Sequence, residues 1–335
     1  MTAGNYYQPT AAGIWTGRID GTDTDVLRWH QRIQPVHLLQ LPSLKPGQQG
    51  IALLGFACDE GVRRNNGRVG AAQGPTALRM ACANLPVHFN EQLVLLDAGD
   101  IVCPDQNLEA AQGALSDAVQ QLHAAGYTPV LLGGGHEITY GHARGIYRSF
   151  PEQKIGLINF DAHFDLRIPA EEGPSSGTGF WQLAQDCRLQ GKPFHYLALG
   201  IQTHSNTQQL FRTARELGVQ IVPAAIFHMQ DLTTLQTAIA QFLQQVDKIY
   251  LTIDLDVFAA PFAPGVSATA YNGILPGGVF MECYRLILQC GKLAGLDIAE
   301  LNPALDIDNR TAKLGAGMVF EAITNYQLRP AQSGP

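Results

Sequence analysis

The sequence is short of charge and contains no long apolar run. Of its 335 residues, 15% are Asp, Glu, Lys or Arg and 46% are hydrophobic, a balance that favours a large buried core. The formal net charge is −7, which argues against a nucleic-acid partner because nucleic-acid binding needs a basic face. No apolar run is long enough to cross a bilayer, and the polar N-terminus lacks the order of a signal peptide. We therefore expect a cytoplasmic protein that binds neither nucleic acid nor membrane.

Cysteine is also scarce, and its spacing carries no motif. The chain has six cysteines, and none of them forms a C-x-x-C pair. In a chain of this length they are interpreted as reduced, mostly buried thiols rather than as a disulfide framework. A nucleophilic cysteine has no support in the sequence.

Short apolar runs, each bounded by turn residues, recur along the chain. They cover residues 50–57, 93–101, 128–135, 155–163, 194–200, 219–226, 248–256 and 293–303. Near-continuous hydrophobic strands of this kind are typical of a parallel sheet that is covered on both faces. Segments with helical spacing lie between the runs, for example at 107–126, 206–218, 234–246 and 277–291. The alternation predicts one three-layer α/β/α domain over residues 1–335, with an irregular lead-in at 1–45.

Acidic residues and histidines gather where the predicted strands end, which is where open parallel sheets bind ligands. In the stretch LINFDAHFDLR (157–167), Asp161, His163 and Asp165 stand two residues apart, so an extended chain turns their side chains the same way. Three other strands end in the same manner, at His136, at Asp254 with Asp256, and at Glu300.

Four carboxylates and two imidazoles without a thiolate are a ligand set that suits manganese-like divalent ions. Two such ions would neutralise the four carboxylates, and at a separation of about 3.5–4 Å they can share a hydroxide that acts as a nucleophile. The additional charge of Glu300 favours a cationic electrophile, such as a guanidinium or amidinium carbon. A single Asp-x-Asp is more often a turn or a cap. Its repetition at several strand ends favours a metal site.

Four blocks of sequence carry a family resemblance. GGGHE (133–137), NFDAHFDLR (159–167), TIDLDVF (252–258) and DIAELNP (297–303) resemble the signature blocks of the ureohydrolase family, which includes arginase and agmatinase. The resemblance spans roughly residues 50–326 and implies a doubly wound, eight-stranded parallel sheet. It also implies a homo-oligomer with two manganese ions per subunit. The ligands that it implies are His136, Asp161, His163, Asp165, Asp254 and Asp256.

Deviations from the arginase pattern indicate the branch of the family. Arginase-like chains carry an acidic residue at the position of Gly135 and a serine at that of Glu137, and Phe180 stands roughly where they carry a proton-shuttling histidine. GGGHE, DAHFDLR, SSGTGF and APGVSA together resemble the formimidoylglutamases. This implies hydrolysis of N-formimidoyl-L-glutamate to L-glutamate and formamide, in histidine degradation. Glu300 would then meet the cationic formimidoyl group, and Asp165 could carry a proton to the leaving nitrogen.

The two carboxylates of such a small-molecule substrate require cations, and arginine is preferred because its donors are bidentate. The candidates are Arg167, two residues beyond Asp165, and the glycine-rich stretch at 58–75, with Ser175 and Ser176 as further donors. That stretch contains Arg63, Arg64 and Arg68. An equally open interpretation of these three arginines is a solvated loop or an oligomer contact.

Three alternatives stay open at this point. An agmatinase or guanidinobutyrase would release urea and would have no use for the arginines, because agmatine carries no carboxylate. A catalytically silent metal-binding scaffold would be free to lose ligands, yet all six are present. A zinc amidohydrolase of the deacetylase type would need fewer acids and a pair of histidines.

Overall fold

All eight apolar runs form strands in the computed structural model, which describes residues 5–326. The strands are β3 (Gln49–Ala57), β4 (Leu93–Val102), β5 (Tyr127–Gly133), β6 (Ile155–Phe160), β7 (His195–Ile201), β8 (Gln220–Pro223), β9 (Lys248–Asp254) and β10 (Leu293–Ala299). They lie in the order β4-β3-β5-β10-β9-β6-β7-β8, and every neighbouring pair is parallel. The first three of these strands form one half of the sheet, in the order β4-β3-β5. The next four form the other half, in the order β9-β6-β7-β8, and β10 lies between β5 and β9. The prediction of a doubly wound parallel sheet is confirmed.

The lead-in adds two short strands at the β4 edge. The strand β1 (Tyr7–Gln8) pairs antiparallel with β4, and β2 (Gln34–Pro35) pairs with β4 in parallel, so the sheet has ten strands within residues 5–326. Between these two strands lies the short helix α1 (Trp29–Arg32). A strand of two residues has no periodicity to detect, which is why the sequence predicted only an irregular segment here.

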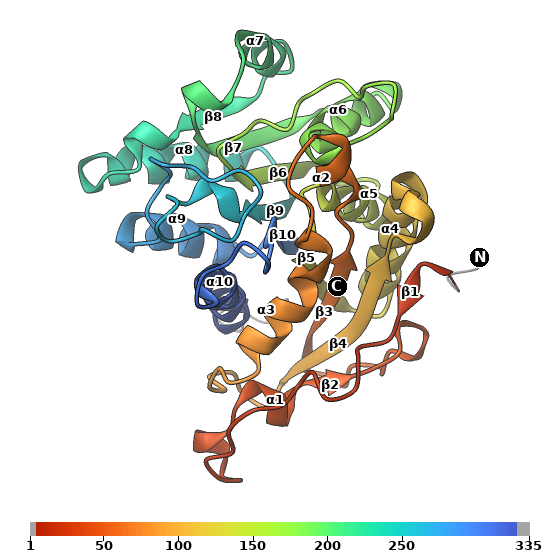
Figure 1. The fold of residues 1–335 in the computed structure, drawn as a ribbon. Coiled ribbons are helices and arrows are strands. Elements are labelled where there is room, and N and C mark those ends of the chain that lie inside the picture. Colours follow the sequence, from red (N-terminus) through yellow and green to blue (C-terminus); the bar gives the residue numbers. More distant parts are fainter. Residues whose placement is uncertain (1–4, 327–335) are drawn as a thin grey trace.

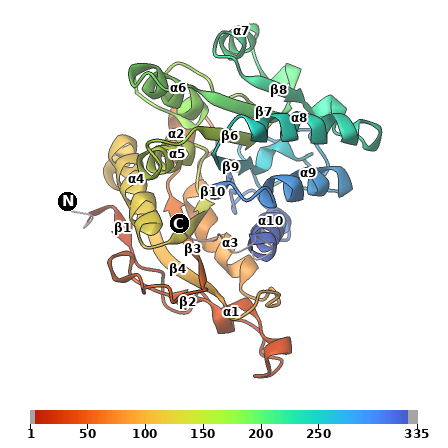
Figure 2. The ribbon, with the colours of Figure 1, turned by 180° about the vertical axis from the view of Figure 1, so that it is seen from behind.

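Helices cover both faces of the sheet, as the alternation predicted (Figures 1 and 2). Leu115 and Ile146 pack into the core on one face, and Leu78 and Val319 pack into the core on the other. The first face is covered by α4 (Leu108–Ala124), α5 (Ile138–Ser149) and α6 (Gly179–Leu189). The second is covered by α3 (Gly74–Cys82), α8 (Leu232–Gln244), α9 (Gly278–Leu288) and α10 (Arg310–Tyr326). The short α2 (Glu60–Arg64) follows β3, and α7 (Gln208–Glu216) precedes β8.

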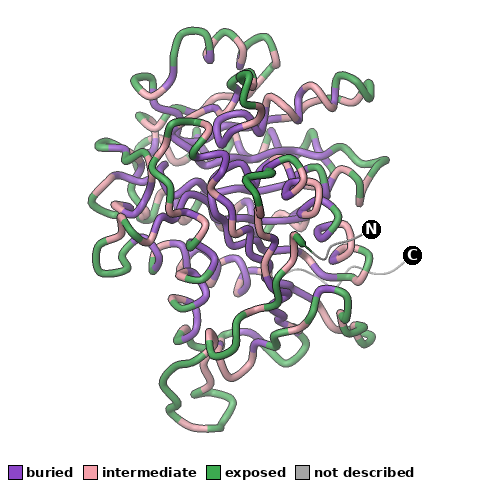
Figure 3. The backbone as a smooth tube through the Cα atoms, turned by 45° about the vertical axis from the view of Figure 1, so that its right-hand side comes forward, coloured by how far each residue is buried: buried purple, intermediate pink, exposed green. Residues whose placement is uncertain are grey.

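Burial is concentrated in the sheet (Figure 3). Every residue of β6 and of β10 is buried, as expected for parallel strands between two helical layers. All six cysteines are free thiols, and four of them are buried. Within residues 5–326, no helix has the length and apolar character that a membrane crossing requires.

A buried ion pair ties the edge of the sheet to α3. Arg79 donates two hydrogen bonds to Asp97, at 2.8 and 2.9 Å, and one to Asp100 at 2.6 Å. The Trp15 indole N–H from the lead-in donates to Asp97 at 2.6 Å. Because the side chains of Arg79 and Asp97 are fully buried, the network joins α3, β4 and the lead-in in a low-dielectric environment.

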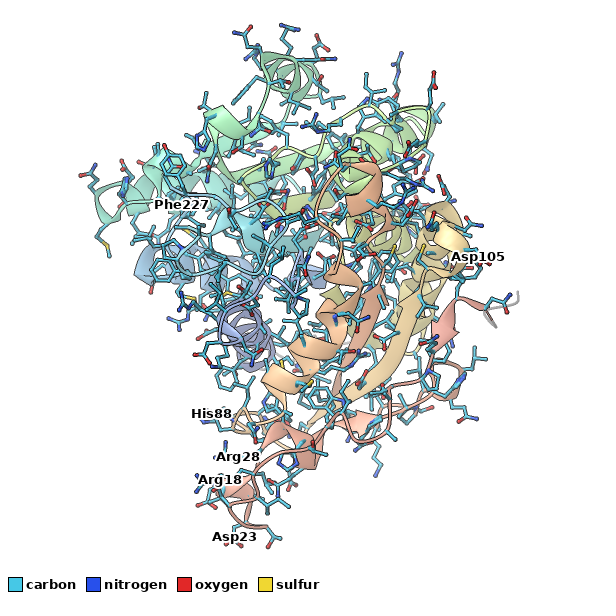
Figure 4. The ribbon with its side chains drawn as sticks, viewed as in Figure 1. Arg18, Asp23, Arg28, His88, Asp105 and Phe227 are labelled. Carbon is cyan, nitrogen blue, oxygen red and sulfur yellow. The ribbon has the colours of Figure 1, made fainter. Side chains whose placement is uncertain are left out.

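Other charges of the lead-in lie at the foot of the molecule, around Arg18, Asp23 and Arg28 (Figure 4). Arg28 pairs there with Asp20, whose carboxylate is 2.7 Å from its Nε, and donates to the Asn84 carbonyl at 2.6 Å. The contact with Asn84 fastens the lead-in to the segment after α3.

Candidate metal centre

The carboxyl ends of four neighbouring strands, β5, β10, β9 and β6, supply the predicted ligands and Glu300. Asp161 follows the last residue of β6, and Asp254 is the last residue of β9. His136 comes three residues after β5, and Glu300 comes directly after β10. Parallel strands bring these ends to one edge of the sheet, and the structure thus gathers residues that are far apart in the chain.

One cluster is centred on His136. Its Nδ1 atom lies 2.8 Å from an oxygen of Asp165 and 3.2 Å from oxygens of both Asp161 and Asp254. The His136 side chain is 1% exposed, and the three carboxylates are at most 13% exposed. One nitrogen and three oxygens thus converge in a largely dry space.

A second cluster adjoins the first and shares Asp161 with it. Nδ1 of His163 lies 3.4 Å from Asp161 Oδ1 and 3.2 Å from Asp256 Oδ2. The other oxygen of Asp161, Oδ2, faces His136. Asp161 therefore presents one oxygen to each cluster, which is the arrangement that two adjacent cations require.

The electrostatics of these groups favour a bound cation. Burial, and then the neighbouring carboxylates of Asp256 and Asp161, raise the pKa of Asp254 well above its usual range. Burial and then Asp161 likewise raise the pKa of Asp165. Oδ1 of Asp256 is buried without a hydrogen-bond partner in the part of the chain that is described. Divalent cations would satisfy this oxygen and relieve the repulsion, so the donor set fits them.

Polar groups behind the ligands hold them in place. The Asn159 amide donates to Asp161 Oδ2 at 3.0 Å, and Thr252 Oγ1 lies 3.0 Å from His136 Nε2. The sequence analysis missed both residues. Each lies two positions before a predicted ligand, on the same side of its strand, so the period of two could have indicated them.

Glu300 sits beside the clusters, held by the backbone. Its Oε1 accepts the His136 N–H at 2.8 Å, and its own N–H donates to the Gly134 carbonyl at 2.8 Å. Glu300 adopts a φ of 67°, in the left-handed region. Burial, and then the nearby Glu137, raise the pKa of Glu300 to about 8.

A cavity of about 320 Å³ opens above the clusters, within the range of small-molecule sites. Five metal-cluster residues and Glu300 form its floor. The floor residues are His136, His163, Asp165, Asp254, Asp256 and Glu300. The walls are mostly polar and include Asn65, Asn66, Arg68, Arg167, Ser176, Ser205, Asn206 and Ser267. The sequence analysis missed the asparagines, Ser205 and Ser267, because loop residues carry no periodic signal.

Arg167 and Ser176, two of the predicted substrate contacts, line this cavity. The exposed Arg167 guanidinium has no ion pair or side-chain hydrogen bond with any described residue. Ser176 accepts a hydrogen bond from Asn65 at 3.1 Å. Ser175 lies in the wall of an adjoining cavity, which Arg167 also lines.

Arg68 lines the cavity, but its guanidinium is engaged with the backbone. It donates to the carbonyls of Ser267 at 2.9 Å and Val266 at 2.8 Å. The predicted contact therefore also joins two loops of the cavity wall that are distant in sequence.

Arg63 and Arg64 do not line this cavity, although Arg64 lines the adjoining one. Their role as substrate contacts stays a prediction. Both pair with Glu60, at 2.7 and 2.9 Å, and Arg64 also pairs with Glu109 at 2.8 Å. Glu60 precedes them by three and four residues, the spacing at which helical side chains meet. The two guanidiniums are thus neutralised within the protein.

Phe180 lies beside the first cluster. Its ring centroid is 6.1 Å from that of His136, and the ring stacks on Tyr196 with centroids 4.1 Å apart. Phe180, which stands roughly where arginases carry the proton-shuttling histidine, is therefore a buried hydrocarbon side chain that cannot carry a proton.

Fold and site together define a doubly wound α/β protein with two adjoining, carboxylate-rich groups of candidate metal ligands. The model of the arginase family matches residues 49–324, and the chain belongs to the arginase family, which is a family of hydrolases. Formimidoylglutamase from Chromobacterium violaceum is 48% identical, over 92% of this chain and 96% of its own. Formimidoylglutamase from Aeromonas hydrophila is 43% identical, over 95% of this chain and 99% of its own.

Solved structures agree with this assignment. Trypanosoma cruzi formiminoglutamase with Mn²⁺ matches with a TM-score of 0.75 and 26% identity, over 88% of this chain and 99% of that one. Formimidoylglutamase from Bacillus subtilis matches with a TM-score of 0.78, over 93% of this chain and 97% of that one. Its identity is 24%, so this likeness concerns the fold.

Proposed function

We propose that the chain is a manganese-dependent formimidoylglutamase, which converts N-formimidoyl-L-glutamate and water to L-glutamate and formamide. The observation that carries the proposal is one cavity that combines the two clusters of candidate metal ligands with the Arg167 guanidinium, which pairs with no other residue within 5–326. The floor suits a cationic amidine, and Arg167 suits a carboxylate. The names of the curated relatives support the same substrate.

The residues that would hold two manganese ions are those of the two clusters. His136, Asp161, Asp165 and Asp254 form the first, and Asp161, His163 and Asp256 form the second. When bound, two such ions supply a water-derived nucleophile at neutral pH and polarise the group under attack.

The protein's own groups position the substrate and move its proton. Glu300 lies on the cavity floor. A cationic substrate group beside it would offset the rise in its pKa that burial causes, so Glu300 would be a carboxylate in the complex and would hold the formimidoyl group as the cationic amidinium. Water oxygen bonds to the amidine carbon, and the bond from that carbon to the glutamate nitrogen breaks. That nitrogen must gain a proton as it leaves. We assign its delivery to Asp165, which faces the cavity, since Phe180 cannot supply one.

Arg167 would bind a substrate carboxylate, with Ser176 and the cavity-facing Arg68 close by. Ser175 belongs to the adjoining cavity and would contact only a substrate that extends toward it. A homo-oligomeric state and a cytoplasmic location stay predictions.

Product analysis tests the proposed function. The manganese-loaded protein should release glutamate and formamide from N-formimidoyl-L-glutamate and should release nothing from arginine or agmatine. Both carry a guanidinium in place of the formimidoyl group, and arginine has one carboxylate whereas agmatine has none. Urea from arginine or agmatine would overturn the substrate assignment. No product from any of the three would favour the silent scaffold.

Changing Arg167 to Met should lower kcat/KM for N-formimidoyl-L-glutamate by about 10- to 100-fold, since a hydrogen bond to a charged group contributes about 1.5–3 kcal/mol. The loss should fall mainly on KM in steady-state kinetics. Arg63→Met is the matched control, because its guanidinium pairs with Glu60 outside the cavity. Equal effects of the two substitutions would contradict the assigned role of Arg167.

A further inference from the structure

Glu137 is a fully buried acid that the reaction above does not use. It follows His136 directly, and its side chain is 0% exposed. Its Oε1 atom accepts the Gly61 N–H at 2.8 Å and lies 3.4 Å from the Cys58 thiol. Its Oε2 atom is buried and has no hydrogen-bond partner among the described residues. Burial of a carboxyl group costs free energy unless hydrogen bonds compensate it, so the bond to Gly61 is the contact that needs to be explained.

The bond to Gly61 caps α2 from another part of the chain. The first amides of a helix lack intrahelical partners, and the residue before the helix usually supplies an acceptor. Asp59 occupies that position but makes no such bond. Its carboxylate accepts the Gly70 N–H at 2.6 Å and the Ala72 N–H at 3.3 Å instead. Glu137 takes over the capping of α2 from the turn after β5.

Two glycines make room for this carboxylate. A Cβ atom on Gly135 would overlap Oε2 of Glu137, and one on Gly61 would lie 2.6 Å from its Cδ atom. The Glu137 side chain therefore fills the volume that side chains at 61 and 135 would take. Gly61, Gly135 and Glu137 form one packing unit, which we name the α2 latch.

The α2 latch extends the pairing of two strands beyond their ends. Past the end of β5, Gly134 donates to the Phe56 carbonyl at 2.8 Å and Gly135 donates to the Cys58 carbonyl at 2.9 Å. The next hydrogen bond between the segment after β5 and the segment after β3 runs from the Gly61 N–H to the Glu137 side chain. Helix α2 then leads directly into the segment 65–68, which forms one wall of the cavity.

We propose that Glu137 is a positioning residue: as a hydrogen-bond acceptor it holds the start of α2, and hence the cavity wall at Asn65, Asn66 and Arg68, in fixed relation to His136. The proposal deepens the proposed function and rests on it, because this wall would enclose the substrate. Glu137 itself lies outside the cavity lining and touches no substrate.

The positioning role of Glu137 requires a hydrogen-bond acceptor, so two substitutions of similar size should have different effects. Glu137→Gln keeps an oxygen for the Gly61 N–H, whereas Glu137→Met fills a similar volume without one. The methionine variant should raise KM for N-formimidoyl-L-glutamate about five- to tenfold, the effect expected from losing a helix cap. Its kcat and manganese content should stay within about twofold of the wild type, and the glutamine variant should match the wild type throughout.

Hydrogen exchange of the Gly61 amide supplies a measurement that is independent of activity. The methionine variant should exchange this amide faster than the wild type, and the glutamine variant should not. Gly135→Ala should reproduce both effects of the methionine variant, because the added methyl group displaces the carboxylate. Gly113→Ala is the matched control, since a Cβ atom there meets open space.

Unchanged KM and unchanged exchange in Glu137→Met would overturn the proposal. So would equal losses in the glutamine and methionine variants, or a loss of manganese, which would place Glu137 in the metal centre instead. If the methionine variant fails to fold, Gly135→Ala against Gly113→Ala decides the question. If the wild type does not hydrolyse the substrate, the proposed function fails while hydrogen exchange still tests the α2 latch.

Discussion

Replacing Asp161 with asparagine is expected to abolish turnover and to release metal from both clusters. Asp161 is the residue that faces His136 with one carboxylate oxygen and His163 with the other. An amide keeps the shape but loses the charge and one acceptor. We expect kcat to fall by more than about 100-fold. Mutation of a residue that only hydrogen-bonds to a metal ligand already lowers metal affinity or activity by about 10- to 100-fold. Manganese content after gel filtration and kcat in excess manganese measure the two effects.

Neighbouring substitutions should separate the two clusters. Asp165 lies against His136, and Asp256 lies against His163, so Asp165→Asn and Asp256→Asn should each weaken one cluster more than the other. Asp117→Asn is a control at the surface, where Asp117 pairs with Arg148. Full metal content and full turnover in Asp161→Asn would refute the two-cluster assignment.

Replacing Arg79 with methionine should destabilise the fold by about 3–5 kcal/mol, the cost of leaving a buried charge without its partner. Asp97 would keep its burial and lose two charge-assisted hydrogen bonds, and Asp100 would lose one. Urea denaturation at neutral pH measures the change in the free energy of unfolding. Activity of the folded fraction should stay near that of the wild type, since this network is not part of the cavity.

Acid should partly rescue this variant. Burial already raises the pKa of Asp100, and Arg79 opposes that rise, so without Arg79 the pKa of Asp100 in the folded state would lie further above its unfolded value. A folded state that binds protons more tightly gains stability as pH falls, so the deficit should shrink at lower pH. Arg148→Met, which breaks an exposed pair with Asp117, should cost no more than about 1 kcal/mol. A similar loss in both variants would contradict the argument from burial.

Local patterns in the sequence account for most of the fold and for the floor of the site. The apolar runs marked eight strands because parallel strands are buried on both faces, and the period of two placed Asp161, His163 and Asp165 together. The walls of the cavity escaped prediction because their contacts join distant segments. Arg68 donates to carbonyls almost 200 residues away, and no local spacing encodes such a pairing.

The charges around α2 show a local contact that the sequence analysis did not use. Arg63 and Arg64 were predicted either to bind substrate, from a glycine-rich loop at the mouth of the sheet, or to belong to a solvated loop or an oligomer contact. The structure pairs both with Glu60, which stands one helical turn before them. The sequence contained the information that these charges are satisfied locally. For Glu137 it did not, because its partner Gly61 lies 76 residues earlier in the chain.

The central position of β10 also sets the order in which the centre can form during synthesis. This strand is the last to be made, yet it alone joins β5 to β9 in the sheet. Until it emerges from the ribosome, His136 stands on one half-sheet and the aspartates on the other. Asp161, His163 and Asp256 already share a half-sheet, so the second cluster can assemble on a nascent chain, whereas the first must wait for the last strand.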